Sequence, residues 1–368
     1  MSAAASTPPS IEFRYLVEQA GFTLDIEGRF ALQGITGVFG PSGSGKTSLL
    51  RCMAGLASPS AAYLKVDRDI WEDSAARVRR APHHRAIAYV FQEPRLFPHL
   101  DVRGNLEYGK RRVEKNARSS IATDQEHIID LLGLGSLLSR RTNGLSGGEA
   151  QRVAIGRALL SAPRLILMDE PLASLDAGRK DELLPFIERL HAELTVPLVY
   201  VSHNIDEICQ LCDQLLVMQG GTALATGDLQ SVLMRTDLPV LGGAEAGAVI
   251  MARVVSYDAE YDLSRLEFSG GVLQAPARYA IGSVVRVRVR ANDISICDES
   301  SGQTSILNRL AAEVIAINQD SSSSVLVHLK TGEDSMLARI TRRSAAHLNL
   351  HPGALVIAQL KSVSVRRS

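Results

Sequence analysis

Residues 40–47 read Gly40-Pro41-Ser42-Gly43-Ser44-Gly45-Lys46-Thr47, which fits the pattern G-x-x-x-x-G-K-[ST] of a phosphate-binding loop. The apolar residues 35–39 predict a buried strand before the loop, and residues 48–54 predict a helix after it. Glycines let backbone N–H groups turn toward a phosphate, and a helix N-terminus adds partial positive charge. We therefore expect a nucleotide here, with Lys46 on its β- and γ-phosphates and Thr47 on Mg²⁺.

The composition of the 368 residues limits the classes of function. A net charge of +0 gives no field that would draw the chain to nucleic acid, and the basic residues 110–118 lack interleaved aromatics, so we expect no nucleic-acid partner. Four cysteines are too few for a disulfide framework and suit a reducing compartment. No run of about 18 or more apolar residues predicts a membrane span. Residues 1–10 lack the features of a signal peptide and predict a disordered tail.

Two carboxylates follow a second apolar run. Residues 165–168 are all apolar, which suits a parallel strand buried on both faces, and Asp169 and Glu170 come at its end. Ligands of α/β sheets bind at the carboxyl ends of the strands. We expect Asp169 to hold Mg²⁺ through water and Glu170 to act as the general base on the attacking water.

Two further strands end in polar side chains. Residues 86–91 lead to Gln92, whose amide is suited to bind Mg²⁺ and position water, and residues 197–201 lead to Ser202-His203. Since these strand ends belong beside the phosphate loop, we expect His203 to contact the γ-phosphate.

A second anion site is predicted at residues 145–149, Leu-Ser-Gly-Gly-Glu, which open a helix that runs to residue 160. Ser146 is placed as the N-cap, with Glu149 completing a capping box. The Ser146 hydroxyl, the N–H groups of Gly147 and Gly148 and the helix dipole would all point at one phosphate.

Other features are less specific. An aromatic of the first strands should stack on adenine, with Phe13, Tyr15 and Phe22 all open, although strand packing suits each of them. The pair Cys209 and Cys212 lacks partner ligands and is interpreted as core. Beyond a glycine-rich boundary at residues 242–247 the pattern changes to short strands. Residues 282–290 and 353–361 resemble each other and predict a duplicated β unit, as one barrel or two.

Taken in order, these motifs resemble the ATPase subunits of ATP-binding-cassette (ABC) transporters over residues 11–230. The resemblance identifies Gln92 as the glutamine loop, residues 145–149 as the signature, Ser174-Leu175-Asp176 as the D-loop and His203 as the switch histidine. It implies an α/β P-loop NTPase domain at 11–235, with a helical subdomain at 93–160. It also implies a head-to-tail homodimer, in which Ser146, Gly147, Gly148 and Asp176 of one subunit help to cover ATP on the other.

The later part resembles the small oxyanion-binding β domain (TOBE/Mop) of molybdate-handling proteins, and residues 95–106 resemble the ATPases of molybdate importers. This implies a linker and first β unit at 236–298 and an OB/Mop-like barrel at 299–368. Candidate oxyanion donors are Thr304, Ser305, Lys361 and Ser362. Leu307 stands where free-standing members carry an arginine, which removes a fork suited to a tetrahedral dianion.

The function implied is ATP hydrolysis coupled to import of molybdate, or tungstate, on the cytoplasmic face of the inner membrane. Permease subunits and a solute-binding protein would be its partners. The same machine serving sulfate, a sugar or a polyamine is the alternative. A soluble cassette ATPase of DNA repair or translation is disfavoured, because the chain has one phosphate loop, one signature and no sustained heptads.

Overall fold

A computed structural model describes residues 9–111, 124–194, 196–298, 304–361 and 363–367. The chain divides into two compact units, one up to Gly227 and one from Asp228 onward. Within the described residues, no helix has the length and apolarity needed to cross a bilayer. The boundaries expected at residues 235 and 298 stay a prediction.

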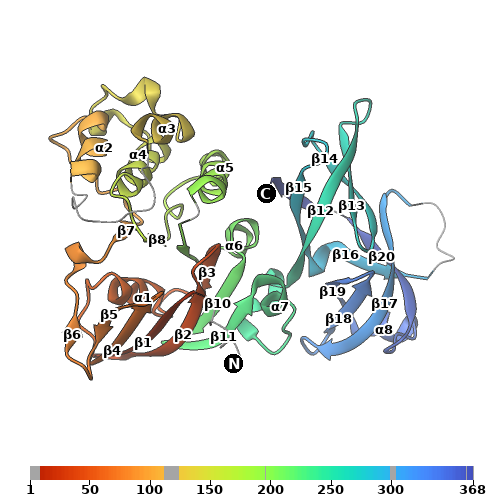
Figure 1. Ribbon diagram of the computed structural model, residues 1–368. Coiled ribbons are helices and arrows are strands. Elements are labelled where there is room, and N and C mark those ends of the chain that lie inside the picture. Colours follow the sequence, from red (N-terminus) through yellow and green to blue (C-terminus); the bar gives the residue numbers. More distant parts are fainter. Residues whose placement is uncertain (1–8, 112–123, 195, 299–303, 362, 368) are drawn as a thin grey trace, which may run out of the picture. The chain divides into compact units, whose positions relative to one another are not determined.

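The first unit carries a six-stranded sheet in the order β11-β10-β3-β9-β8-β7 (Figure 1). Its strands are β3 (Ile35–Phe39), β7 (Ile87–Val90), β8 (Leu165–Asp169), β9 (Leu198–Ser202), β10 (Gln214–Gln219) and β11 (Thr222–Asp228). All pairs from β10 to β7 are parallel. Because β3, β8 and β9 are buried at every position, each reads as a continuous apolar run in the sequence.

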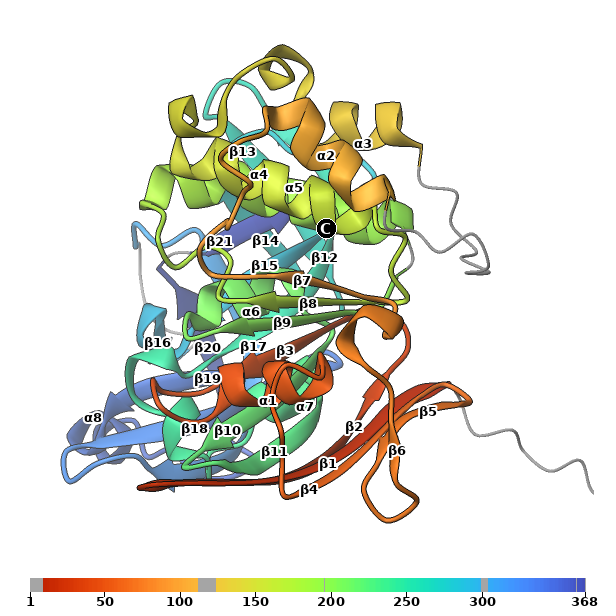
Figure 2. The same ribbon diagram turned by 90° about the vertical axis from the view of Figure 1, so that its left-hand side faces the viewer.

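A second, antiparallel sheet lies beside it in the order β2-β1-β4-β5-β6. Its strands are β1 (Ser10–Gln19), β2 (Phe22–Ala31), β4 (Ala61–Val66), β5 (Asp69–Asp73) and β6 (Val78–Arg79). Helix α1 (Lys46–Met53) packs between the two sheets, as Figure 2 shows, and buries Leu49, Leu50 and Met53 in their shared core. This placement fixes α1, and with it the loop before it.

Helices cover the parallel sheet and form the subdomain expected at 93–160. They are α2 (Val102–Arg111), α3 (Gln125–Leu131), α4 (Gly147–Leu159), α5 (Ala177–Leu194) and α6 (Ile205–Leu211). Contacts join α2, α3 and α5 to α4, and α4 reaches β7. The two cysteines of α6 and its C-cap, Cys209 and Cys212, are buried and free, so their interpretation as core is confirmed.

The second unit contains two five-stranded sheets, in the orders β14-β13-β12-β15-β21 and β16-β20-β17-β18-β19. The first comprises β12 (Gly247–Asp258), β13 (Leu263–Phe268), β14 (Gly271–Pro276), β15 (Val284–Arg290) and β21 (Ser364–Arg367). The second comprises β16 (Ile294–Cys297), β17 (Asn308–Gln319), β18 (Ser324–Thr331), β19 (Asp334–Thr341) and β20 (Leu355–Leu360). Helices α7 (Leu229–Leu233) and α8 (Arg342–His347) flank them.

The two similar stretches noticed in the sequence form β15 and β20, one in each sheet. A single hydrophobic core takes side chains from both sheets. The all-β fold expected for this part is confirmed, and the sheets share one core rather than forming two separate ones.

Candidate functional site

The loop at residues 40–47 joins β3 to α1 in a shape that requires glycine. Gly45 is the N-cap of α1 and has φ 97°, and Gly43 has φ 80°. A Cβ atom on Gly40 would lie 2.2 Å from the carbonyl oxygen of Met218. Side chains at these positions would therefore strain or displace the loop, and the backbone stays close to whatever it binds.

The Lys46 amine lies inside the loop. Its Nζ donates hydrogen bonds to the carbonyl oxygens of Gly40 (2.7 Å) and Pro41 (3.0 Å), and lies 3.8 Å from Oε1 of Glu170. Burial lowers the pKa of Lys46, whereas the carboxylates of Glu170 and Asp169 act to raise it. A buried cation beside two acids is suited to receive a polyanion such as a triphosphate.

Asp169, at the end of β8, is held by two hydroxyl groups. Thr47 Oγ1 donates to its Oδ1 at 2.9 Å and the Tyr89 hydroxyl donates to its Oδ2 at 2.8 Å. Burial raises the pKa of Asp169, and these two hydrogen bonds act in the opposite direction. The described residues contain no cluster of three or more His, Cys, Asp or Glu suited to a metal. A carboxylate beside a hydroxyl nevertheless fits Mg²⁺, which keeps most of its water and takes one or two protein carboxylates.

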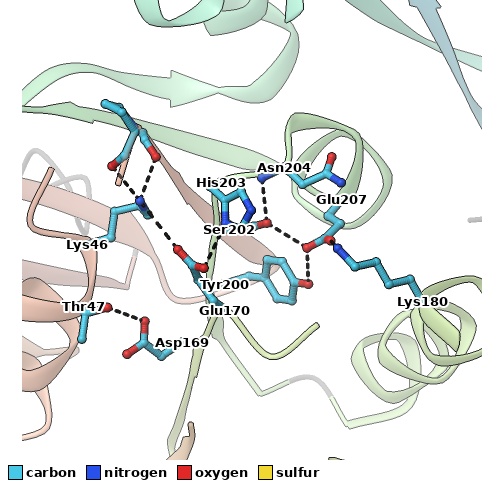
Figure 3. A network of polar contacts seen from close by, with 12 residues as sticks. Lys46, Thr47, Asp169, Glu170, Lys180, Tyr200, Ser202, His203, Asn204 and Glu207 are labelled. Atoms are coloured by element: carbon cyan, nitrogen blue, oxygen red, sulfur yellow. Dashed lines mark hydrogen bonds and ion pairs between the residues drawn. The ribbon is translucent and has the colours of Figure 1, made fainter. Parts of the chain in front are cut away.

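Glu170 and His203 meet at the ends of β8 and β9 (Figure 3). Nδ1 of His203 lies 2.9 Å from Oε2 of Glu170. Glu170 has φ 45°, a left-handed backbone conformation that costs about 1–3 kcal/mol for a residue other than glycine. The expected pair of strand ends is therefore brought together, and the strained backbone turns the Glu170 carboxylate toward Lys46.

A pocket of about 590 Å³ opens over the loop. Its lining comprises Gln19, Phe22, Ser42, Gly43, Gly45, Lys46, Thr47, Ser48, Gln92 and Glu170. The structure decides among the three aromatics, since Phe22 lines the pocket while Phe13 and Tyr15 are buried in the core. Gln92 lies where the sequence predicts it, and Gln151 Nε2 donates to the preceding carbonyl of Phe91 at 3.3 Å.

The signature residues lie away from this pocket. Ser146 caps α4 by accepting from the Glu149 amide at 3.3 Å, and Glu149 Oε2 accepts from the Ser146 amide at 2.7 Å. The predicted capping box is thus confirmed. Ser146 and Gly147 are exposed, as is Asp176, which accepts from the Arg179 amide at 3.0 Å. None of the three lines the pocket of the same chain, so the two anion-binding surfaces are separate.

The candidate oxyanion donors lie where β17 begins and β20 ends. Asn308 pairs with Leu360, so the residues flanking this pair, Leu307 and Lys361, come close together. Thr304, Ser305 and Lys361 are exposed and Leu307 is 63% exposed. Ser362 lies outside the described residues.

Sequence reasoning missed Tyr89 and Glu207. Tyr89 was counted only as an apolar strand residue, and its position next to β8 gives its hydroxyl access to Asp169. Glu207 is buried on α6 and accepts hydrogen bonds from Tyr200 (3.0 Å) and Ser202 (2.8 Å). A charged residue inside an otherwise apolar helical stretch was the available signal.

Two family profiles match this chain. The profile described as "ABC transporter" matches residues 24–173, and the profile described as "TOBE domain" matches residues 304–366. Among solved structures, a nucleotide-free ATP-binding cassette from an ABC transporter aligns with TM-score 0.54 at 23% identity, over 64% of this chain and all of the other. The structure of cbiO1 from Clostridium perfringens aligns with TM-score 0.53 at 23% identity, over 63% and 94%. These two similarities support the fold of the first unit.

Whole-length relatives are more similar. The molybdenum import ATP-binding protein ModC 1 of Azotobacter vinelandii is 46% identical over 96% of this chain and 98% of its own length. The ModC protein of Thiobacillus denitrificans is 47% identical over 97% and 98%. The chain therefore belongs to the family of the molybdenum import ATP-binding proteins, the ATP-hydrolysing subunits of ABC transporters.

Proposed function

We propose that this chain hydrolyses ATP to drive molybdate import. The observation that carries the proposal is the identity of 46–47% with molybdenum import ATP-binding proteins over nearly the whole length, the second unit included. The solute preference of such a transporter rests on its partners, so an identity that spans both units supports a shared solute better than a match to the first unit alone.

In this proposal ATP lies on residues 40–47 with its adenine on Phe22, which borders the pocket. The Lys46 amine exchanges its carbonyl contacts for the β- and γ-phosphates. Thr47, Asp169 and Gln92 would hold Mg²⁺, which when bound supplies positive charge to neutralise the phosphates.

Glu170 is the proposed general base. It accepts a proton from the attacking water, and His203, 2.9 Å away, orients its carboxylate and reaches the γ-phosphate. Gln92 positions the water from the opposite side of the pocket. The support is geometric, because Lys46, Glu170 and Gln92 line the same pocket.

The proposal includes a head-to-tail homodimer. Ser146, Gly147 and Gly148 form a capped helix start that is separate from the pocket, so a second copy is needed to bring an anion-binding helix to the nucleotide. Asp176 would contact the partner beside them. The dimer would act on permease subunits at the cytoplasmic face of the inner membrane, supplied by a solute-binding protein.

In the second unit, Thr304, Ser305, Lys361 and Ser362 are proposed to bind oxyanion. The pairing of Asn308 with Leu360 supports this, because it gathers their segments at one end of the sheet. Lys361 then supplies the positive charge, since Leu307 cannot.

The decisive test is cellular uptake of radiolabelled molybdate and sulfate, with the wild-type chain or Glu170→Gln as the only copy. We expect Glu170→Gln to abolish molybdate uptake and leave sulfate uptake intact, while Glu182→Gln, at an exposed position of α5, serves as the matched control. Undiminished molybdate uptake with Glu170→Gln would remove the solute assignment.

Purified protein tests the chemistry separately. Glu170→Gln should keep ATP binding and accumulate an ATP-bound dimer, because only the base is lost. Normal hydrolysis by this variant would show that Glu170 is not the base.

A further inference from the structure

A buried carboxylate outside the pocket connects three elements of the first unit. Glu207, on α6, accepts hydrogen bonds from the Tyr200 hydroxyl (3.0 Å) and Ser202 Oγ (2.8 Å), both on β9. Its other oxygen, Oε1, lies 2.9 Å from Nζ of Lys180 on α5. The Glu207 side chain is 5% exposed, so its charge is compensated by this one lysine and two hydroxyl groups (Figure 3).

The network continues to both sides of His203. Ser202 Oγ donates to Glu207 and accepts a hydrogen bond from the Asn204 amide at 3.0 Å. The residues directly before and after the histidine are therefore tied to one buried carboxylate. His203 itself makes no contact with Glu207 and faces Glu170 instead.

The other end of the network lies one helical turn from the Asp176 loop. The Lys180 amide donates to the Asp176 carbonyl oxygen at 3.0 Å, in the first turn of α5. A shift of this loop would move the base of Lys180, and the ion pair would carry the shift to β9 and α6.

We infer that the Lys180–Glu207 pair is a positioning device, which holds the turn of His203 and links it to the loop of Asp176. The inference rests on the proposed function, in which His203 acts on the γ-phosphate and Asp176 faces a second copy. A buried ion pair contributes little net stability compared with apolar residues of similar volume, so stability alone gives little reason for it. A rigid link between two loops of one reaction cycle gives a better one.

The test compares Lys180→Met and Glu207→Gln with wild type in ATP hydrolysis, equilibrium ATP binding and thermal unfolding. We expect each to lower kcat by about tenfold to a hundredfold, the effect of a small misplacement of a reacting group, with ATP affinity unchanged. Lys180→Arg, which keeps the cation, should recover most of the rate. If Glu207→Gln does not fold, Lys180→Met carries the test, because its side chain is 20% exposed.

The chain offers a matched control in the same helix pair. Gln210 on α6 donates to Glu188 on α5 at 2.7 Å, without a bond to β9. Glu188→Gln weakens an α5–α6 contact and should leave kcat unchanged. An equal fall of kcat in this control would mean that α5–α6 packing, not positioning of the histidine, is what matters.

NMR of protein labelled on its nine histidines gives a readout that packing alone does not move. The His203 ring signal, assigned with His203→Ala, should shift in Lys180→Met and Glu207→Gln but not in Glu188→Gln. Unchanged kcat and an unmoved signal in both variants would overturn the inference while leaving the proposed function intact. Full activity of His203→Ala would instead overturn the proposed role of His203, and the ring signal would still decide whether the pair positions it.

Discussion

We expect Arg85→Met to destabilise the first unit by about 4–6 kcal/mol. The Arg85 side chain is completely buried, and its Nη2 lies 2.8 Å from Oε2 of Glu72, which is 5% exposed. Breaking such a pair costs about 3–5 kcal/mol, because the remaining charge is left buried without compensation. Nη1 also donates to the carbonyl oxygens of Cys52 and Met53 at the end of α1, and losing these bonds adds about 1 kcal/mol.

The assay is urea unfolding followed by tryptophan fluorescence. Trp71 is the single tryptophan of the chain, is fully buried and lies in the first unit, so its emission reports that unit alone. With a slope of about 2–3 kcal/mol per molar urea, the midpoint should fall by about 2 M. Total stabilities of about 5–15 kcal/mol make this a large part of the whole.

Two further variants separate the charge from the side-chain volume. Adding Glu72→Gln to Arg85→Met should recover part of the loss, because the uncompensated charge disappears. Arg164→Met is the control, since the Arg164–Asp69 pair is partly exposed and lies beside the same tryptophan, and it should change stability by less than about 1 kcal/mol. The reasoning is refuted if Arg85→Met costs no more than this control, or if Glu72→Gln gives no recovery.

Three other predictions concern the nucleotide pocket. Burial raises the pKa of Asp169 in the folded state, so its ionised form opposes folding at neutral pH; Asp169→Asn should raise the Tm of the nucleotide-free protein there, with a gain that vanishes once acid protonates the wild-type carboxyl. Tyr89→Phe removes a donor that lowers the pKa of Asp169, so the acidic limb of the pH–rate profile should move to higher pH; an unmoved limb would mean that Asp169 does not control it. Phe22→Ala should weaken binding of ATP by about 1–3 kcal/mol and leave binding of inorganic triphosphate unchanged, as calorimetry with both ligands would show.

Local patterns predicted much of the site. The strand before the loop, the strand before Asp169 and the capping box at Ser146 follow from runs and spacings of a few residues, and the structure contains all three. Each depends on neighbours in the sequence, so no knowledge of the tertiary fold was needed.

Long-range contacts were beyond such patterns. Phe22, Phe13 and Tyr15 share the same strand-forming character, and only the packing of the sheets shows which one borders the pocket. The contact of Tyr89 with Asp169 depends on β7 lying next to β8, although about 75 residues separate them along the chain. Glu207 finds Lys180 only because α5 and α6 pack together.

The pairing of β21 with β15 has a consequence during synthesis. Val365 pairs with Val287, so the edge of β15 stays uncovered until residues 364–367 have left the ribosome. The 73 residues between the two strands (291–363) take about 4–15 s to make at ordinary elongation rates. During that time the first unit can fold, while the second presents an open strand edge to other nascent chains. A nonsense mutation just before β21 should therefore spare nucleotide binding yet yield an aggregating protein.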